Sequence, residues 1–208
     1  MITIHHLNHS RSHRVLWLLE ELGVQYQLIK YQRDKITNLA PKELKEVHSL
    51  GKSPVLQNND EKIIESGAIV TYIIDQYADE TFYPKFTDGD YYQYLQLMHY
   101  AEGSAIAPFI LQLYMRFLGN NSEPLQPRIK SEIKKHLSYL ANILGNNDFF
   151  FRNQFSGVDI MLSFVIEAGK ISGALIPFPN LEALIKRYQN RVSYKKAIEV
   201  GGDYLLGK

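Results

Sequence analysis

A proline stands at the entrance of a short apolar run in residues 51–56, GKSPVL. Proline cannot donate a ladder hydrogen bond, so a strand tolerates it at an edge, at a first position or at a bulge. An X–Pro bond adopts the cis form at a cost of only about 0.5–1 kcal/mol. If Ser53–Pro54 is cis, the backbone N–H and C=O of Ser53 can face solvent and pair with a short extended peptide as an added strand. The alternative is an ordinary trans proline at the start of a strand.

Polar side chains near this proline match the two ends of such a peptide. Ser66 lies where a hairpin pattern ends and a helix pattern begins, and we expect it to be the N-cap. A helix N-terminus binds carboxylates through its free N–H groups and its dipole. Glu65 beside it can pair with an amine, and Lys52 offers a cation for a second carboxylate. These residues predict a site for a small peptide with free termini, held in the middle by the backbone of Ser53.

Composition limits the chemistry that this site can perform. The 208 residues contain no cysteine, which excludes disulfides, thiolate metal sites and a cysteine nucleophile of the chain's own. Any thiol chemistry must therefore use the thiol of another molecule. Lys and Arg (23) balance Asp and Glu (22), so no nucleic-acid partner is expected. The chain opens with a strand pattern rather than a signal peptide, so we expect a cytoplasmic protein. Charges interrupt its most apolar segment, so we expect no membrane span.

Alternating strand and helix patterns in the first part of the chain position the candidate residues. Residues 2–7 alternate like a strand, a helix follows that stops at Gly23, and residues 26–31 predict a second, parallel strand. After a short helix around residues 41–48, the runs PVLQ and KIIE flank the turn NNDE and predict an antiparallel hairpin that leads into a helix. The sum is a small mixed sheet with helices, in the order βαβ and then ββα.

Helical patterns replace strand patterns after residue 79. Residues 80–87 are rich in turn formers and predict a linker, and long helices are expected over about 88–118 and 124–144. A further helix opens at Ser156, which forms an acidic variant of the capping box with Asp159. We therefore interpret Asp159 as structural and keep it out of the active site.

The motifs together resemble a known family. GKSPVL followed by ESGAIVTYIIDQY is similar to the glutathione-binding signature of the cytosolic glutathione S-transferases. The resemblance covers nearly the whole chain and continues through HSRSHRVLWLLEELGVQY, YQRD, YAEGS and FSGVDI, a set most similar to the fungal and bacterial enzymes related to the yeast microsome-associated transferase. It implies a fold of class α/β plus all-α. Its parts would be a thioredoxin-like glutathione-binding domain (1–79), a linker (80–87) and an all-helical domain lining the electrophile site (88–208).

The family pattern implies a role for each residue of the candidate peptide site. Pro54 would be cis, and the backbone of Ser53 would pair with the cysteinyl unit of glutathione. Glu65 and Ser66 would hold the γ-glutamyl group, and Lys52 would approach the glycine carboxylate. Glutathione would serve as a co-substrate, with no metal or bound cofactor.

A donor near the first helix is expected to activate the thiol of glutathione. Lowering a thiol pKa from near 8.5 by about 2 units requires roughly 2.7 kcal/mol of stabilisation of the thiolate. One hydrogen bond to the anion contributes about 1.5–3 kcal/mol, and a helix N-terminus adds about 0.3–1 kcal/mol. We predict that Ser10 is the N-cap and the donor, with Arg11 adding positive potential, as in the serine-type classes that the loop resembles. Asn8, His9 and Ser12 are competing donors, and a plain helix cap is the alternative role of Ser10.

The second substrate is expected to bind in the cleft between the domains, against the long helix that starts near residue 88. Tyr100, Ser104, Pro108 and Tyr114 could line an apolar pocket there, although an aromatic stripe at helical spacing also suits a core. The resemblance further implies a homodimer, in which Glu102 would reach the glutathione amine of the partner subunit. A solvated helix face is the alternative role of Glu102.

His9 and His13 share the i, i+4 spacing of a zinc pair, but they straddle the expected start of the helix without an HExxH glutamate. We therefore predict no metal site.

The sequence predicts a glutathione transferase, which activates the thiol of glutathione for attack on hydrophobic electrophiles or hydroperoxides. The alternative is a non-catalytic glutathione-transferase-like module that binds a ligand or a protein.

Overall fold

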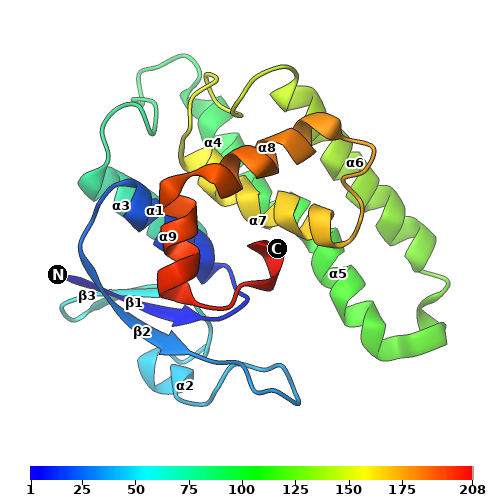
Figure 1. Ribbon diagram of the computed structural model, residues 1–208, viewed down its shortest axis with the longest axis horizontal. Helices are drawn as coiled ribbons and strands as arrows, with labels where there is room; N and C mark the ends of the chain where they lie inside the picture. The colour runs from blue at the N-terminus through cyan, green and yellow to red at the C-terminus, as the bar shows by residue number, and fades with distance from the viewer. Residues whose placement is uncertain (208) are drawn as a thin grey trace. The chain divides into compact units, whose positions relative to one another are not determined.

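The computed structural model describes residues 1–207, without the side chains of residues 120–122. Contacts divide the chain into two units (Figure 1). The sheet unit comprises Met1–Asp79 together with the end of the chain from Gln189, and the helical unit comprises Glu80–Tyr188. The end of the chain, which the sequence analysis assigned to the helical domain, thus packs with the sheet instead.

The sheet unit is built on a four-stranded mixed sheet with the order β2-β1-β3-β4. β1 (Ile2–Leu7) and β2 (Tyr26–Tyr31) run parallel, as the βαβ pattern predicted. β3 (Val55–Asn58) pairs antiparallel with β1 and forms the predicted hairpin with β4 (Glu61–Ile63). Because β1 and β2 are parallel, the loops that follow both strands leave the sheet at the same edge.

The α-helices described wholly within the sheet unit are α1 (Ser12–Glu21), α2 (Leu44–Val47), α3 (Ser66–Tyr77) and α9 (Val192–Gly201), and a 3₁₀ turn, Leu205–Gly207, follows α9. α1 is buried along the whole of residues 12–19 because it contacts β1, α3 and α9, and Figure 1 shows α9 (red) beside α1 (blue). Trp17 is fully buried and its Nε1 donates to Ser193 Oγ at 3.2 Å. A Cβ at Gly201 would lie 3.0 Å from Leu16 Cδ1, so glycine permits the close approach of α9 to α1.

The helical unit contains α4 (Tyr91–Tyr100), α5 (Ala107–Met115), α6 (Gln126–Leu144), α7 (Gly157–Ile171) and most of α8 (Pro179–Asn190). The single long helix expected from about residue 88 is interrupted by a π-helical turn, Ala101–Ala105. Pro108 explains the interruption, because its ring clashes with the carbonyl of Ser104 and it has no N–H to continue a regular ladder. A 3₁₀ segment, Arg116–Ser122, follows α5. In the described part of the chain, no helix is both long and apolar enough to cross a membrane.

α7 begins with the predicted capping box. Val158 N donates to Ser156 Oγ at 3.3 Å, and Ser156 N donates to Asp159 Oδ2 at 3.0 Å. Asp159 is fully buried and also accepts hydrogen bonds from Tyr188 Oη at 2.8 Å and Phe150 N at 3.3 Å. Burial raises the pKa of Asp159 to about 6 although these donors oppose the shift. The structural interpretation of Asp159 is therefore confirmed.

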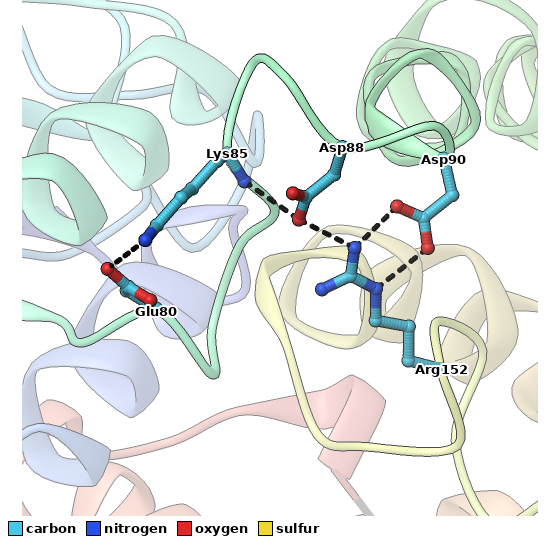
Figure 2. Close-up of polar contacts among 5 residues, drawn as sticks. All are labelled: Glu80, Lys85, Asp88, Asp90 and Arg152. Atoms are coloured by element: carbon cyan, nitrogen blue, oxygen red, sulfur yellow. Dashed lines mark hydrogen bonds and ion pairs between the residues drawn. The ribbon is translucent and has the colours of Figure 1, made fainter.

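Ion pairs hold the segment that the sequence analysis read as a linker (Figure 2). Arg152 lies in the loop before α7, where its Nε donates to Asp90 at 2.7 Å and its Nη2 donates to Asp88 at 2.8 Å. Lys85 N also donates to Asp88 at 3.2 Å, and Lys85 Nζ lies 2.7 Å from Glu80. Residues 80–90 are thus tied to the helical unit.

Candidate functional site

Three segments that carry candidate residues meet at one edge of the sheet. The antiparallel register of β1 with β3, continued by two residues, places Leu7 opposite Ser53. Only two residues separate the end of β4 from Ser66, the first residue of α3, and α3 contacts β3. The loop after β1, the turn before β3 and the start of α3 therefore lie together, as a shared ligand site requires.

The turn before β3 presents an unpaired stretch of backbone. The Ser53–Pro54 peptide bond is cis. Ser53 Oγ accepts a hydrogen bond from Leu7 N at 3.0 Å and donates to His5 O at 2.9 Å, which fixes the turn to the end of β1. Within residues 1–207, the backbone hydrogen bonds outside helices and strands include none to the N–H or C=O of Ser53. The main chain of this half-buried serine can pair with an extended ligand.

α3 offers its N-terminus beside this turn. The N-cap is Glu65 rather than Ser66, because Glu65 has a non-helical φ of 65° and its carbonyl accepts from Ile69 N at 2.9 Å. The helix therefore starts at Ser66, which is buried, while the Glu65 side chain is exposed. The N–H groups of the first turn have no partner within an α-helix, so they can bind an anion. Lys52, which precedes Ser53 in the chain, is exposed on the turn.

The loop between β1 and α1 holds Ser10 in a compact set of hydrogen bonds. Ser10 Oγ donates to Leu7 O at 2.7 Å, lies 2.8 Å from Ser12 Oγ and accepts from Ser12 N at 3.2 Å. Ser12 Oγ is in turn 2.7 Å from His6 Nδ1. The N-cap of α1 is Arg11 rather than Ser10, and Ser10 is only 6% exposed. Its hydroxyl must leave Leu7 O to donate to a sulfur atom.

The other polar residues of this loop have different orientations. Asn8 Oδ1 accepts from Arg33 N at 2.8 Å and its carbonyl accepts from Arg33 Nε at 3.2 Å, so the Nδ2 end of the amide remains as a donor. His9, with φ 50°, turns its ring to the end of the chain. Its Nδ1 accepts from Leu205 N at 2.9 Å and its Nε2 lies 3.5 Å from Asp203 Oδ2.

Two histidines beneath the loop are neutral near pH 7. Burial lowers the pKa of His6 to about 4, opposed by a hydrogen bond with the backbone of Gly201. Burial lowers the pKa of His13 to about 3, and the nearby His6 and Arg14 lower it further. His13 packs buried against Tyr204, whereas His9 bonds Leu205 N. No group of three or more His, Asp or Glu among residues 1–207 could hold a metal ion.

The residues predicted for the electrophile pocket lie along α4, the π-helical turn and α5. Tyr100 Oη is 2.5 Å from His136 Nδ1, Ser104 is exposed, Pro108 is buried and Tyr114 is 61% exposed. Glu102 is half-buried in the π-helical turn. A cavity of about 520 Å³ in the helical unit involves other described residues, among them Gln112, Met115, Arg116, Ile129, Lys130 and Ile171. The identity of the electrophile pocket stays a prediction.

The sequence analysis missed the contribution of the chain's end to this site. Residues 203–205 contact the loop after β1, yet no motif marks them. The sequence offered one hint of packing at this end of the chain: two tyrosines, Tyr194 and Tyr204, lie before and after the turn GGD. Periodicity cannot connect such a signal with a loop at the other end of the chain.

Comparisons with known proteins bear on both units. Sequence models of the glutathione S-transferase N-terminal and C-terminal domains match residues 1–75 and 108–199. The chain is 32% identical to glutathione S-transferase 3 of Schizosaccharomyces pombe, over 98% of this chain and 87% of that protein. It is 27% identical to glutathione S-transferase 1 of Saccharomyces cerevisiae, over 98% of each. A glutathione S-transferase of Actinobacillus pleuropneumoniae, 31% identical, matches in structure with a TM-score of 0.88 over 100% of this chain and 96% of that chain. The chain therefore belongs to the glutathione S-transferase family, as its motifs predicted.

Proposed function

We propose that this member of the family binds glutathione at the edge of the sheet where Ser53, Ser66 and the loop after β1 meet, and activates its thiol there. The observation that carries the proposal is the main chain of Ser53. Its side chain is anchored to β1, while its N–H and C=O stay outside the internal hydrogen bonds described for residues 1–207. Backbone pairing of this kind recognises an extended peptide of any side-chain composition.

The ends of glutathione match the groups on either side of Ser53. The backbone of Ser53 pairs with the cysteinyl unit, next to Pro54. The first turn of α3, with Ser66, binds the α-carboxylate of the γ-glutamyl group through free N–H groups and the helix dipole. The exposed Glu65 pairs with the α-amino group, and Lys52 pairs with the glycine carboxylate. The ligand thus lies stretched along the edge, which brings its sulfur toward the loop after β1.

Ser10 is the proposed donor to the thiolate. On ligand binding its proton turns from Leu7 O to the sulfur, while the Ser12 N–H keeps its oxygen in place. The Arg11 cation at the N-cap of α1 adds positive potential. The thiolate then attacks an electrophilic carbon and expels a leaving group such as halide, while the thiol proton passes to solvent. With a hydroperoxide as substrate, the thiolate attacks the outer oxygen instead, and the O–O bond breaks to release the alcohol. The glutathione sulfenic acid so formed condenses with a second glutathione, which gives the disulfide and water.

The proposal also includes a pocket for the second substrate and a homodimer. Tyr100, Ser104, Pro108 and Tyr114 are candidates for the electrophile pocket. In a homodimer, Glu102 would approach the glutathione amine of the partner subunit.

Retention on glutathione resin and conjugation of a chromogenic aryl chloride test the proposal. We expect wild type to bind and turn over, and Ser10→Ala to lower kcat/KM about 10–100-fold, because a hydrogen bond to an anion contributes about 1.5–3 kcal/mol. Ser131→Ala, at an exposed serine of α6, is the matched control. Binding without turnover of any electrophile or peroxide would identify a non-catalytic module. Full activity in Ser10→Ala with loss in Asn8→Ala would move the donor role to the amide of Asn8.

A further inference from the structure

The last residues of the chain form a strap, residues 202–207, that follows α9 and reaches the loop after β1. His9 is the point of attachment. Its Nδ1 accepts from Leu205 N at 2.9 Å, and its Nε2 faces the Asp203 carboxylate at 3.5 Å. Both ring nitrogens are therefore used to hold the strap.

A second attachment lies on the first turn of α1. The ring of Tyr204 stacks on His13, with centroids 3.9 Å apart and planes 4° from parallel. Both side chains are buried, and Tyr194 of α9 packs edge-on against the same histidine at 5.1 Å. The far end of the strap is closed by Gln189, whose Nε2 donates to Gly207 O at 3.0 Å. The strap is thus anchored on both sides of its contact with His9.

The loop needs such support because of its backbone. His9 has φ 50°, a left-handed conformation that a residue with a side chain adopts only where its surroundings hold it. The hydrogen bond from Leu205 N to the His9 ring and the 3.5 Å contact of that ring with Asp203 supply that restraint. Asn8 and Ser10, the candidate donors to the thiol, are its direct neighbours in the chain.

We propose that the strap positions the thiol-activating loop, and that His9 is the positioning residue through which it acts. This inference rests on the proposed function. His9 does not touch glutathione in this arrangement; it holds the backbone that carries the donor. Small misplacements of a catalytic group lower rates by up to about 100-fold, so a released strap reduces activity without removing a catalytic residue.

Variants of the full-length chain test the proposal through the pKa of the bound thiol, followed by the ultraviolet absorbance of the thiolate against pH. We expect His9→Ala to raise that pKa by about 1 unit and to lower kcat/KM about 5–50-fold, with glutathione affinity changed less than about 3-fold. His9→Gln should recover most of the loss, because its Oε1 can accept from Leu205 N. Leu205→Ala is the matched control, because it keeps the backbone N–H and removes only an exposed side chain.

Tyr204→Ala separates positioning from direct donation by His9. If the strap acts as proposed, this variant also raises the thiol pKa and speeds amide exchange at residues 8–12. A normal thiol pKa in both Tyr204→Ala and His9→Ala would overturn the inference, and a raised pKa in His9→Ala alone would make His9 a donor instead. If wild type fails to bind glutathione, the proposed function fails. The strap is then judged by amide exchange alone, and unchanged exchange at residues 8–12 in His9→Ala refutes it.

Discussion

The sheet unit buries two histidines next to the loop between β1 and α1, whereas the helical unit buries a carboxylic acid at the start of α7. Burial lowers the pKa of His6 to about 4 and that of His13 to about 3. The same cause raises the pKa of Asp159 to about 6. Desolvation always disfavours the charged form, so all three groups shift toward neutrality. One physical cause therefore makes these buried groups of the two units respond to pH in opposite directions.

Proton linkage gives the direction in which each buried group changes the free energy of unfolding with pH. His6 and His13 have pKa values in the folded protein below the unfolded value of 6.5. Their contribution to the free energy of unfolding is therefore present above pH 6.5 and is lost as the pH falls toward 4 and 3. Asp159 has a folded pKa above the unfolded 3.8, so its contribution is present below pH 3.8 and is lost as the pH rises through about 6. Mild acid therefore weakens the sheet unit and favours the capping box of α7. His136 in the helical unit, whose pKa is lowered by partial burial, opposes Asp159 in part.

Among the variants that test this comparison, Asp159→Ala should lower the free energy of unfolding the most. The substitution leaves Ser156 N, Phe150 N and Tyr188 Oη without their buried acceptor. Each unsatisfied buried group costs about 1–3 kcal/mol, so we expect a loss of about 3–5 kcal/mol in the free energy of unfolding. Urea denaturation at pH 7 measures this loss, and a change below about 1 kcal/mol would contradict the role of Asp159.

Asp159→Asn is the matched control, since it keeps one acceptor oxygen and removes the titration. It should be less destabilising than Asp159→Ala at pH 7. Its deficit should widen as the pH falls from 7 to 4, because wild type alone gains stability on protonation of Asp159. A deficit that is constant with pH would show that Asp159 titrates normally.

His13→Phe should remove part of the acid sensitivity of the sheet unit while keeping an aromatic ring against Tyr204. Wild type loses about 2–3 kcal/mol through His13 between pH 7 and 4.5, because each pH unit below the unfolded pKa costs about 1.4 kcal/mol. The variant should therefore show a flatter dependence of unfolding free energy on pH. His99→Phe, at an exposed histidine of α4, should leave the wild-type slope. Equal slopes in wild type and His13→Phe would refute the buried neutral state.

Arg191→Ala should lower the free energy of unfolding less than Asp159→Ala does. Its guanidinium donates from Nε to Glu21 at 3.0 Å, and the Glu21 side chain is 13% exposed. Burial alone would raise the pKa of Glu21, but Arg191 and Ser193 hold it below its usual range. We expect a loss of about 1–2 kcal/mol in unfolding free energy, between the values typical of exposed and of buried pairs.

Arg152→Ala is the matched contrast in the helical unit. Arg152 pairs with Asp88 and Asp90 in an exposed setting and holds their pKa values below the usual range (Figure 2). Salt screens exposed pairs, so the effect of Arg152→Ala should be smaller than that of Arg191→Ala and should fade at high ionic strength. Equal losses for the two variants, or a loss that persists in high salt at Arg152, would show that burial does not decide the strength of these pairs.

Much of the fold followed from local sequence signals. The parallel β1–β2 pair, the β3–β4 hairpin and the capping box of Ser156 and Asp159 all matched their patterns. The caps of α1 and α3 did not, because Arg11 and Glu65 take the N-cap positions expected for their serine neighbours. N-cap preference is a difference of about 1 kcal/mol, which the geometry of a ligand loop readily overrides.

The order of strands and helices, the family motifs and the capping box can be predicted from the amino-acid sequence. Each of these depends on residues a few positions apart, through side-chain periodicity and local hydrogen bonds. Three other features emerge only on folding: the end of the chain joins the sheet unit, the Ser10 hydroxyl points at Leu7 O, and His9 binds a residue 196 positions away. Burial and partners of this kind arise when distant segments pack together, so no local pattern encodes them.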